Sequence, residues 1–566
     1  MSTETTALSV RQLGLRLAVA SLSGIGVFLA FPRAELAPLA WVVLVPILWS
    51  ARGATGKQHF LIGWFAGTID NLGSFYWICG MLIDFGHMST WLSMVLTILL
   101  AAYQGLVFGL WLYLLFRLQR ICTWGYGLLA PLTYVAAEVL IYFIFPWYYG
   151  NSQYRMIPLI QICELGGVTL LSFLMVMANG LLMDGWLRFR NGLPRAWLPL
   201  SVAVCIPLLM GGYGLMRMAM LDDEMQAAPH LTIGLVEADV GIWEKEDKLK
   251  IEDNLVRHQR MSIELEKRGA QLIVWPETSY WAPLSYARRA GHAEIERFRI
   301  LPRDATFIPP GKSPPPEHAA EDRTLFTPEI DRVAPQRGFQ TPLLFGAETW
   351  RKNPNSRSRR HPGLDMFNSA LLLDKDGTVL GAYDKVYLLM FGEYIPLGGY
   401  FPQFYDWLPE SSELTPGESV DVLPFRDFKI GVMVCYEDIL PAFSRKIAAM
   451  NPNVLINVTN DAWFGKTAEP YLHLALAVFR AVESRVALVR STNTGVSAFI
   501  DPVGRILSQT DIYNAETLLE KIPMMKGGSP YQKLGDWPAY LCLITIVFLF
   551  VRARFTKAGR RGAVSR

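Results

Sequence analysis

A series of long apolar segments limits what this 566-residue chain can fold into. Most approach or exceed the ~20 residues that an α-helix needs to cross a bilayer. The predicted spans are Leu13–Phe31, Leu36–Ala51, Phe60–Ile83, Trp91–Phe116, Trp124–Phe145, Gly166–Leu187, Ala196–Met216 and Trp537–Val551. We interpret the first as an uncleaved span, because its apolar run is long and no clear cleavage site follows. The sequence therefore predicts a multi-span α-helical membrane domain with about eight transmembrane helices.

Positive charge near the span ends predicts the orientation. If the first seven segments all cross, the following basic residues fall on one side: Arg11, Arg16, Arg52, Lys57, Arg117, Arg120, Arg188, Arg190, Arg195, Arg552, Arg554, Lys557, Arg560 and Arg561. The opposite side has only Arg33, Arg155 and Arg217 near span ends. The positive-inside rule then places both termini in the cytoplasm and the polar middle of the chain outside it.

Three carboxylates lie within or at the ends of these apolar segments, namely Asp70, Glu138 and Glu164. Ionisable groups in a membrane are functional candidates. The alternative is that they cap helices or lie in the headgroup zone, and for Glu138 and Glu164 we favour that alternative.

Composition excludes some classes of protein. The chain is 51% hydrophobic with a mean hydropathy of +0.24, which is too apolar for an ordinary soluble protein. Its basic residues form no stripe interleaved with aromatic residues, so nucleic acid is not an expected partner. Of six cysteines, only Cys435 lies in the polar middle, where it has no disulfide partner and no C-x-x-C metal pair. A purely packing role does not readily explain a lone thiol in an oxidising compartment.

From about Asp222 to Pro523 the chain alternates strand-like and helix-like segments, which indicates an α/β domain. The predicted strands are Leu231–Val236, Leu272–Trp275, Leu343–Thr349, Ser369–Leu373, Val379–Tyr383, Lys429–Val434, Val454–Val458, Ala487–Arg490 and Val496–Ile500, and the predicted helices are Glu244–Lys267 and Glu469–Arg485. We interpret a Pro-rich stretch near 299–340 as an insertion rather than a lid. The expected domains are therefore 1–221 in the membrane, 222–525 in the polar region, and 526–566 as a last span with a basic tail.

Three strand ends in the polar domain offer a carboxylate, an amine and a thiol: Glu277, Lys385 and Cys435. Each alone has an ordinary explanation, as a helix cap, a solvated lysine or a small buried hydrophobe. Together they supply what thiol chemistry needs, which is a proton acceptor and a positive group facing the developing oxyanion. No histidine lies near these strand ends, and His473 falls within a predicted helix, so a Glu base with a Lys donor is the economical arrangement.

Several motifs occur in a familiar order. They are W-P-E-T-S at Trp275–Ser279, N-S-A-L-L at Asn368–Leu372, Y-D-K at Tyr383–Lys385, F-G-E-Y-I-P at Phe391–Pro396, C-Y-E-D at Cys435–Asp438, T-N-D-A-W-F-G at Thr459–Gly465, R-A-V-E at Arg480–Glu483 and N-T-G-V-S at Asn493–Ser497. The set resembles the carbon–nitrogen hydrolase (nitrilase) superfamily. With apolar spans on both flanks, the chain resembles the apolipoprotein N-acyltransferase family over nearly its whole length.

The resemblance implies a nitrilase-like αββα sandwich in the periplasm, attached to a multi-pass protein of the bacterial inner membrane, with no metal or organic cofactor. Glu277 would be the general base, Lys385 the oxyanion stabiliser and Cys435 the nucleophile. Glu393, Tyr436 and Glu437 match supporting positions. The enzyme, acting as a monomer, would move a fatty acyl chain from a phospholipid, typically phosphatidylethanolamine, through a cysteine thioester. The acceptor would be the α-amine of diacylglyceryl-cysteine in an apolipoprotein.

The chain departs from the family pattern at several positions. Glu237 and Asp239 stand where V-Q-x-N-I is common, Trp243 matches a following tryptophan only loosely, and Tyr387 and Met390 replace His and Pro. These differences bear on donor and acceptor preference. Two other functions stay open on sequence alone: a membrane-tethered amidase or thiol hydrolase of the same superfamily, and a catalytically inactive membrane assembly protein.

Overall fold

The computed structural model describes residues 7–241, 244, 250–285, 287–289, 292–294, 335–356, 358, 361–401, 403–408 and 411–564. The chain divides into two compact units, Met1–Met220 with Ser529–Arg566, and Leu221–Gly528. Trp243 and most of the Pro-rich stretch lie outside the described residues, so the predictions made for them stay predictions.

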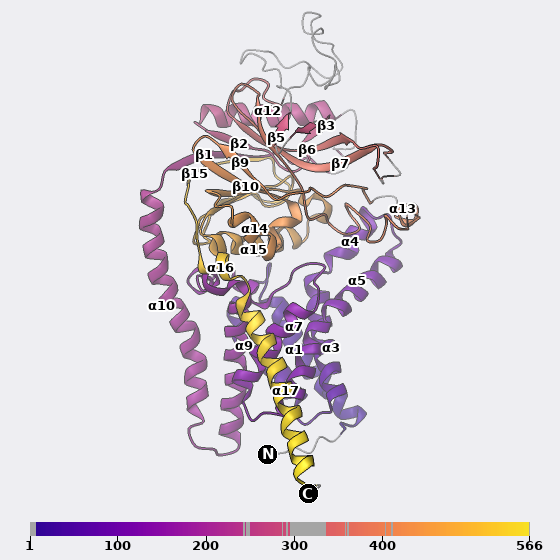
Figure 1. The fold of residues 1–566 in the computed structure, drawn as a ribbon, viewed down its shortest axis with the longest axis vertical. Helices are drawn as coiled ribbons and strands as arrows, with labels where there is room; N and C mark the ends of the chain where they lie inside the picture. The colour runs from indigo at the N-terminus through magenta and orange to yellow at the C-terminus, as the bar shows by residue number, and fades with distance from the viewer. Residues whose placement is uncertain are drawn as a thin grey trace, which may run out of the picture. The chain divides into compact units, whose positions relative to one another are not determined.

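The first unit is helical. Its elements are α1 (Val10–Leu29), η1 (Ala37–Trp41), α2 (Val45–Ala51), α3 (Gly56–Ser74), α4 (Trp77–Asp84), α5 (Thr90–Gln104), α6 (Leu106–Gln119), α7 (Tyr126–Leu140), η2 (Tyr149–Gln153), α8 (Ile157–Ile160), α9 (Cys163–Arg190), α16 (Pro530–Leu534), α17 (Trp537–Val564) and most of α10 (Trp197–Ala227). Helix α3 packs on α1 and α6, while α9 and α17 pack on α7 (Figure 1). Small residues bring these helices close: a Cβ on Gly63 would lie 2.2 Å from the carbonyl oxygen of Phe108.

In the part of the chain that the structure describes, five helices are long and apolar enough to cross a membrane: Val10–Leu29, Thr90–Gln119, Cys163–Arg190, Trp197–Ala227 and Trp537–Phe555. Ala37–Ala51 and Tyr126–Leu140 are shorter apolar helices. The predicted span Phe60–Ile83 is divided between α3 and α4. These helices fit a membrane domain, and the number of about eight spans stays a prediction.

The three carboxylates Asp70, Glu138 and Glu164 are buried and have polar partners. Glu138 accepts hydrogen bonds from the backbone N–H of Tyr149, at the start of η2, and from the hydroxyl of Ser172. Glu164 lies 3.0 Å from Nε of Arg217 and also accepts a hydrogen bond from the hydroxyl of Tyr213. Asp70 accepts a hydrogen bond from Ser74. The contact to the first backbone N–H of η2 gives Glu138 the capping role that we favoured over a functional one.

The second unit is a sandwich of two sheets. One sheet has the order β15-β1-β2-β6-β7-β8 with β3 beside β6, and the other has the order β14-β13-β12-β11-β10-β9. The strands are β1 (His230–Glu237), β2 (Leu272–Val274), β3 (Tyr280–Ser285), β6 (Leu343–Lys352), β7 (Leu364–Leu373), β8 (Val379–Asp384), β9 (Val422–Phe425), β10 (Phe428–Val434), β11 (Val454–Val458), β12 (Ala487–Ser491), β13 (Ala498–Ile500), β14 (Ile506–Gln509) and β15 (Glu516–Pro523), with a separate pair β4 (Ala287–Arg289) and β5 (His292–Glu294).

Helices cover both outer faces of the sandwich. Helix α12 (Ile251–Lys267) packs on β1 and β15, while α14 (Pro441–Ala448) and α15 (Glu469–Ser484) pack on β10 and β12 (Figure 1). The short helix α13 (Phe404–Trp407) lies in the connection after β8. The αββα architecture expected from the resemblance is therefore confirmed, with strands within a few residues of the predicted ones. Strands β6 and β7 are longer than predicted because they pair as an antiparallel ribbon from Leu343 and Leu373 to Lys352 and Leu364.

Apolar strands set the positions of the polar residues that follow them. Strands β10, β11 and β12 run parallel, so their carboxyl ends meet at one edge of their sheet. In the other sheet, β6 passes directly behind the loop that carries Glu277: a Cβ on Gly346 would lie 2.6 Å from the Cα of Glu277. Glycine at that position fixes where the Glu277 backbone lies.

Candidate active site

Glu277 lies just beyond the end of β2 and is buried. Its Oε1 accepts a hydrogen bond of 2.6 Å from Nδ2 of Asn368, a residue of β7. The same amide nitrogen donates to Oε1 of Glu393 at 2.9 Å. Asn368 thus holds two carboxylates from separate loops beside one another, which is a role that the sequence did not reveal.

Lys385 follows β8 directly, and its side chain is only 1% exposed. Its Nζ lies 2.7 Å from Oε2 of Glu393 and 3.8 Å from Oε1 of Glu277. The Lys385 backbone N–H donates to the carbonyl of Asn368, which fixes the start of the side chain. Burial lowers the pKa of Lys385, but the charges of Glu393, Cys435 and Glu277 outweigh it and raise the pKa above its ordinary value. The amine is therefore a permanent cation at neutral pH.

Cys435 is the first residue after β10, and it adopts a left-handed backbone conformation with φ of 51°. That conformation is uncommon for a residue with a side chain and is typical of sharp turns at functional sites. The turn is held by Asn457, whose Nδ2 donates to the Cys435 carbonyl at 3.1 Å. Burial and the negative charge of Glu277 raise the pKa of the thiol, while Lys385 opposes that effect. The resting side chain is therefore a neutral thiol that needs a base.

Glu437 ties the cysteine turn to the loop that follows Lys385. Its fully buried carboxylate accepts hydrogen bonds from the Tyr383 hydroxyl and from the backbone N–H groups of Val386, Tyr387 and Val434. Burial raises its pKa to about 7, although these donors favour the charged form. One carboxylate thus links the two sheets at the point where each presents a candidate catalytic residue.

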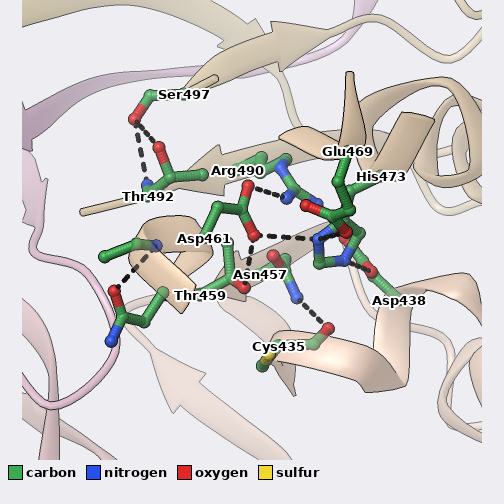
Figure 2. Close-up of polar contacts among 12 residues, drawn as sticks. Cys435, Asp438, Asn457, Thr459, Asp461, Glu469, His473, Arg490, Thr492 and Ser497 are labelled. Carbon is green, nitrogen blue, oxygen red and sulfur yellow. Dashed lines mark hydrogen bonds and ion pairs between the residues drawn. The ribbon is translucent and has the colours of Figure 1, made fainter. Parts of the chain in front are cut away.

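A second group of charged side chains lies beside the cysteine turn (Figure 2). Oδ2 of Asp438 lies 2.7 Å from Nη1 of Arg490, and Oδ2 of Asp461 lies 2.8 Å from Nη2 of Arg490. His473, from α15, contacts Oδ1 of Asp438 at 2.8 Å and Oδ1 of Asp461 at 2.9 Å. We call these four residues the charge ring. All four are buried.

The charge ring is electrically balanced. Burial and Arg490 each lower the pKa of His473, but Asp438 and Asp461 outweigh them and raise it to about 10. Burial opposes ionisation of Asp461, yet Arg490 and His473 lower its pKa to about 2. Two basic and two acidic side chains therefore face one another in a buried site. The expectation that no histidine lies near these strand ends was wrong for the folded structure. Helix α15 packs against the cysteine turn and brings His473 into contact with Asp438, three residues after Cys435.

Asp461, Glu469 and His473 are close enough together to be considered as metal ligands. Their chemistry does not favour a metal. Both ring nitrogens of His473 already contact carboxylates, and the Arg490 guanidinium supplies positive charge to the second oxygen of each of these carboxylates. Burial and the nearby charge of Asp461 raise the pKa of Glu469 well above its ordinary value, which favours the neutral acid over a charged ligand.

The structure brings most of the predicted site residues together. Glu277, Lys385 and Glu393 are in direct contact, and their charges act on the thiol of Cys435. Glu437 has a clear positioning role. Tyr436 is buried beside the cysteine, and its burial does not by itself assign it a role. The residues that the sequence reasoning missed lie within quoted motifs or far along the chain: Asn368, Tyr383, Asp438, Thr459, Asp461, His473 and Arg490.

Two departures from the family pattern have structural explanations. Glu237 lies between the sheets, where Oε2 accepts hydrogen bonds of 2.6 Å from the hydroxyls of both Ser497 and Thr510. Burial raises its pKa to about 8, so it is mainly a neutral acid at pH 7, chemically close to glutamine. Tyr387 accepts a hydrogen bond from Nζ of Lys446 and is 38% exposed, so it lies at the outside of the domain.

A double-layered α/β sandwich that presents a buried carboxylate, amine and thiol at its strand ends has the features of a carbon–nitrogen hydrolase. The family model described as Carbon-nitrogen hydrolase matches residues 233–527, and the one described as Apolipoprotein N-acyltransferase N-terminal domain matches residues 23–181. The chain is 30% identical over 534 residues to the apolipoprotein N-acyltransferase of Geobacter metallireducens, covering 93% of this chain and 92% of that protein.

A second relative, the apolipoprotein N-acyltransferase of Pseudomonas putida, is 26% identical, with 94% of this chain and 96% of that protein covered. Among solved structures, Saccharomyces cerevisiae Nit3 of the nitrilase superfamily is 17% identical with a TM-score of 0.34, covering 52% of this chain and 90% of that one. An amidase from Nesterenkonia sp. is 18% identical with a TM-score of 0.33, covering 53% and 92%. The chain belongs to the apolipoprotein N-acyltransferase family.

Proposed function

We propose that Cys435 carries the acyl chain as a thioester in this N-acyltransferase, with Glu277 as general base and Lys385 as oxyanion stabiliser. Membership of the family makes the protein a membrane-integral enzyme of lipoprotein N-acylation. The observation that carries the proposal is the clustering of three charged groups around a buried thiol: the buried Lys385 contacts the buried Glu277 and the partly buried Glu393, and the charges of all three act on Cys435.

In the first half-reaction the thiol proton moves to the carboxylate of Glu277, and the sulfur attacks the ester carbonyl carbon of a phospholipid. The negative charge that develops on the carbonyl oxygen faces the Lys385 ammonium, which is stabilising in a buried site. The carbon–oxygen ester bond then breaks, and the departing lysophospholipid alcohol takes the proton from Glu277. The acyl chain remains on Cys435 as a thioester.

In the second half-reaction the neutral α-amine of diacylglyceryl-cysteine attacks the thioester carbonyl. Glu277 accepts a proton from the nitrogen, and Lys385 again faces the oxyanion. The carbon–sulfur bond then breaks, and the departing thiolate takes the proton from Glu277, which restores the resting enzyme. Because the thioester separates the two steps, donor and acceptor use one site in turn. No step needs a metal or organic cofactor.

Glu393 supports this assignment of roles. It pairs with Lys385 at 2.7 Å, whereas Glu277 lies 3.8 Å away from the amine, so Glu277 is the carboxylate less engaged by the cation. The carboxylate that lies farther from the lysine is less stabilised in its charged form and is therefore the better proton acceptor. Glu437 and Asn368 hold the loops on which these groups stand.

The proposal includes where the chemistry occurs. We propose that both termini lie in the cytoplasm and the catalytic domain in the periplasm, at a bacterial inner membrane, and the positive charge near the span ends supports this orientation. The donor is then a membrane phospholipid and the acceptor is a diacylated apolipoprotein, both presented at that bilayer. We propose a monomer, because one chain contains every group that the reaction uses.

Two measurements test the proposal. Purified protein incubated with acyl-labelled phospholipid is expected to retain a covalent label that Cys435→Ala lacks; equal labelling of both would exclude Cys435 as nucleophile. Mass spectrometry of a diacylated lipopeptide, incubated with enzyme and phospholipid, is expected to show the gain of one acyl chain. Free fatty acid with an unchanged peptide would instead indicate a hydrolase.

A further inference from the structure

Thr459 lies directly after β11, where the parallel register with β10 brings it beside Cys435. The register pairs Val434 with Val458, so the next residues of the two strands are Cys435 and Thr459. The Thr459 backbone N–H donates to the carbonyl of Ser491 at 2.9 Å, which fixes its backbone to β12. Its side chain is completely buried. A hydroxyl is thus held next to the sulfur at the common edge of three parallel strands.

The hydroxyl of Thr459 makes only a weak hydrogen bond in the resting structure. The hydroxyl donates to Oδ1 of Asp461 at 3.5 Å, which is at the long end for an O–H···O hydrogen bond (Figure 2). Asp461 itself cannot move closer, because Arg490 and His473 hold its two oxygens at 2.8 and 2.9 Å. A hydroxyl hydrogen rotates to suit its surroundings, so a stronger acceptor within reach would take it.

A stronger acceptor forms at Cys435 when the thiol loses its proton. Glu277, Lys385 and Glu393 face the thiol from the other sheet, and Thr459 faces it from the end of β11. A hydrogen bond from Thr459 to the ionised sulfur lowers the thiol pKa and so opposes the effect of burial. Lys385 is already paired with Glu393. Lys385 is also assigned to the carbonyl oxygen during the reaction, so it cannot serve the sulfur alone. The thiolate therefore needs a second donor.

We propose that Thr459 is a further catalytic residue, whose hydroxyl turns from Asp461 to donate a hydrogen bond to the Cys435 sulfur as the thiolate forms. The inference rests on the proposed role of Cys435 as nucleophile. The thiol proton goes to Glu277, and Thr459 keeps its own proton throughout. Once the thioester has formed, the sulfur carries no charge and the hydroxyl returns to Asp461. The charge ring acts through Thr459, because it fixes the acceptor that orients the resting hydroxyl.

The test measures the reactivity of the sulfur without requiring either lipid substrate. Full-length enzyme, Thr459→Val and Thr459→Ser are treated with iodoacetamide between about pH 6 and pH 10, and alkylation of the Cys435 peptide is quantified by mass spectrometry. Valine keeps the shape of threonine and removes the donor, whereas serine keeps the donor. Quantifying the Cys435 peptide separates its reaction from that of the exposed Cys205.

Thr459→Val is expected to alkylate about tenfold more slowly at neutral pH, with the apparent thiol pKa raised by about one unit, since hydrogen bonds to charged acceptors are the strong ones. Thr459→Ser is expected to stay within about twofold of wild type. In acyl-enzyme formation from phospholipid, Thr459→Val is expected to lower kcat with KM unchanged. Because Thr459→Val buries an extra methyl next to Asp461, Thr459→Ala is measured in parallel, with the same expectation.

An unchanged alkylation rate and pH profile in both Thr459→Val and Thr459→Ala would overturn the role of Thr459. A loss in Thr459→Ser as large as in Thr459→Val would also overturn it, because serine retains the hydroxyl. Failure of the proposed function has a different signature: Cys435→Ala would then retain acyl label. The two assignments therefore fail independently.

Discussion

The buried Lys385 forms an ion pair of 2.7 Å with Glu393, closer than the 3.8 Å that separates Lys385 from Glu277. The difference in distance indicates different roles for these two carboxylates, which Asn368 holds side by side. Glu393 neutralises the lysine in the resting enzyme, and Glu277 keeps the capacity to accept a proton. The same pairing explains why a lysine can be buried at 1% exposure and still remain charged.

Replacing Glu393 with Gln is expected to slow acyl-enzyme formation by about 10² or more, since it removes the nearer partner of a buried cation. Lys385 would then pair with Glu277 and withdraw the base from the thiol. The Gln side chain can still accept from the Leu389 backbone N–H, which Glu393 does at 2.8 Å, so the loop is expected to keep its conformation. The measurement is the single-turnover rate with labelled phospholipid, and the exposed substitution Glu418→Gln is the control. A rate near that of the control would mean that Lys385 does not need this partner.

Replacing Glu277 with Gln is expected to lower the rate of thioester formation by about 10² or more while leaving the folded protein intact, because glutamine keeps the shape but cannot accept the proton. Its amide oxygen can still accept the hydrogen bond from Asn368. The loss should shrink as pH rises, because hydroxide then generates the thiolate without a base. A near-normal rate at neutral pH would transfer the role of base to another group.

The parts of this enzyme that sequence predicted are those that local pattern determines. Apolar runs ending in a polar residue located β2, β8 and β10, and therefore Glu277, Lys385 and Cys435. Ordered motifs then fixed the family, because eight weak signals in sequence order are jointly specific. Local pattern also identified the membrane helices, although helix length alone does not set the number of crossings.

Contacts between distant residues were not predictable in this way. Asp438 and His473 are separated by 35 positions, and only the packing of α15 against the cysteine turn brings them together. Asn368 stood in a quoted motif, yet its role depends on β7 lying between two loops that carry carboxylates. Periodicity reports which face a residue occupies, not which partner it meets there.

Glu237→Gln tests whether a buried acid makes stability depend on pH. The pKa of Glu237 is about 8 in the folded protein against 4.5 ordinarily, so the folded state holds the proton more tightly. Its contribution to stability is therefore complete below about pH 4.5 and is lost as pH rises through about 8. In thermal unfolding in detergent, the stability of Glu237→Gln relative to wild type is expected to increase as pH rises through that window, by up to a few kcal/mol in the free energy of unfolding. Glu418→Gln is the exposed control, and parallel curves for wild type and Glu237→Gln would show that Glu237 is ionised in both states.

The charge ring predicts a strong coupling between Asp438 and His473. Either Asp438→Asn or His473→Gln leaves a buried charge uncompensated, which typically costs about 3–5 kcal/mol, so each single variant is expected to unfold several degrees earlier than wild type. The double variant removes one charge of each sign and leaves Arg490 paired with Asp461 at 2.8 Å. It is therefore expected to lose less stability than the sum of the two single losses.

Because the His473 pKa is about 10 when folded and 6.5 ordinarily, its stabilisation is complete below about pH 6.5 and is lost as pH rises through about 10. Two results would contradict this picture: additive stability losses in the double-mutant cycle, or a wild-type stability that does not fall relative to His473→Gln over that pH range. Either would mean that the imidazole is neutral and that the ring is not balanced by charge.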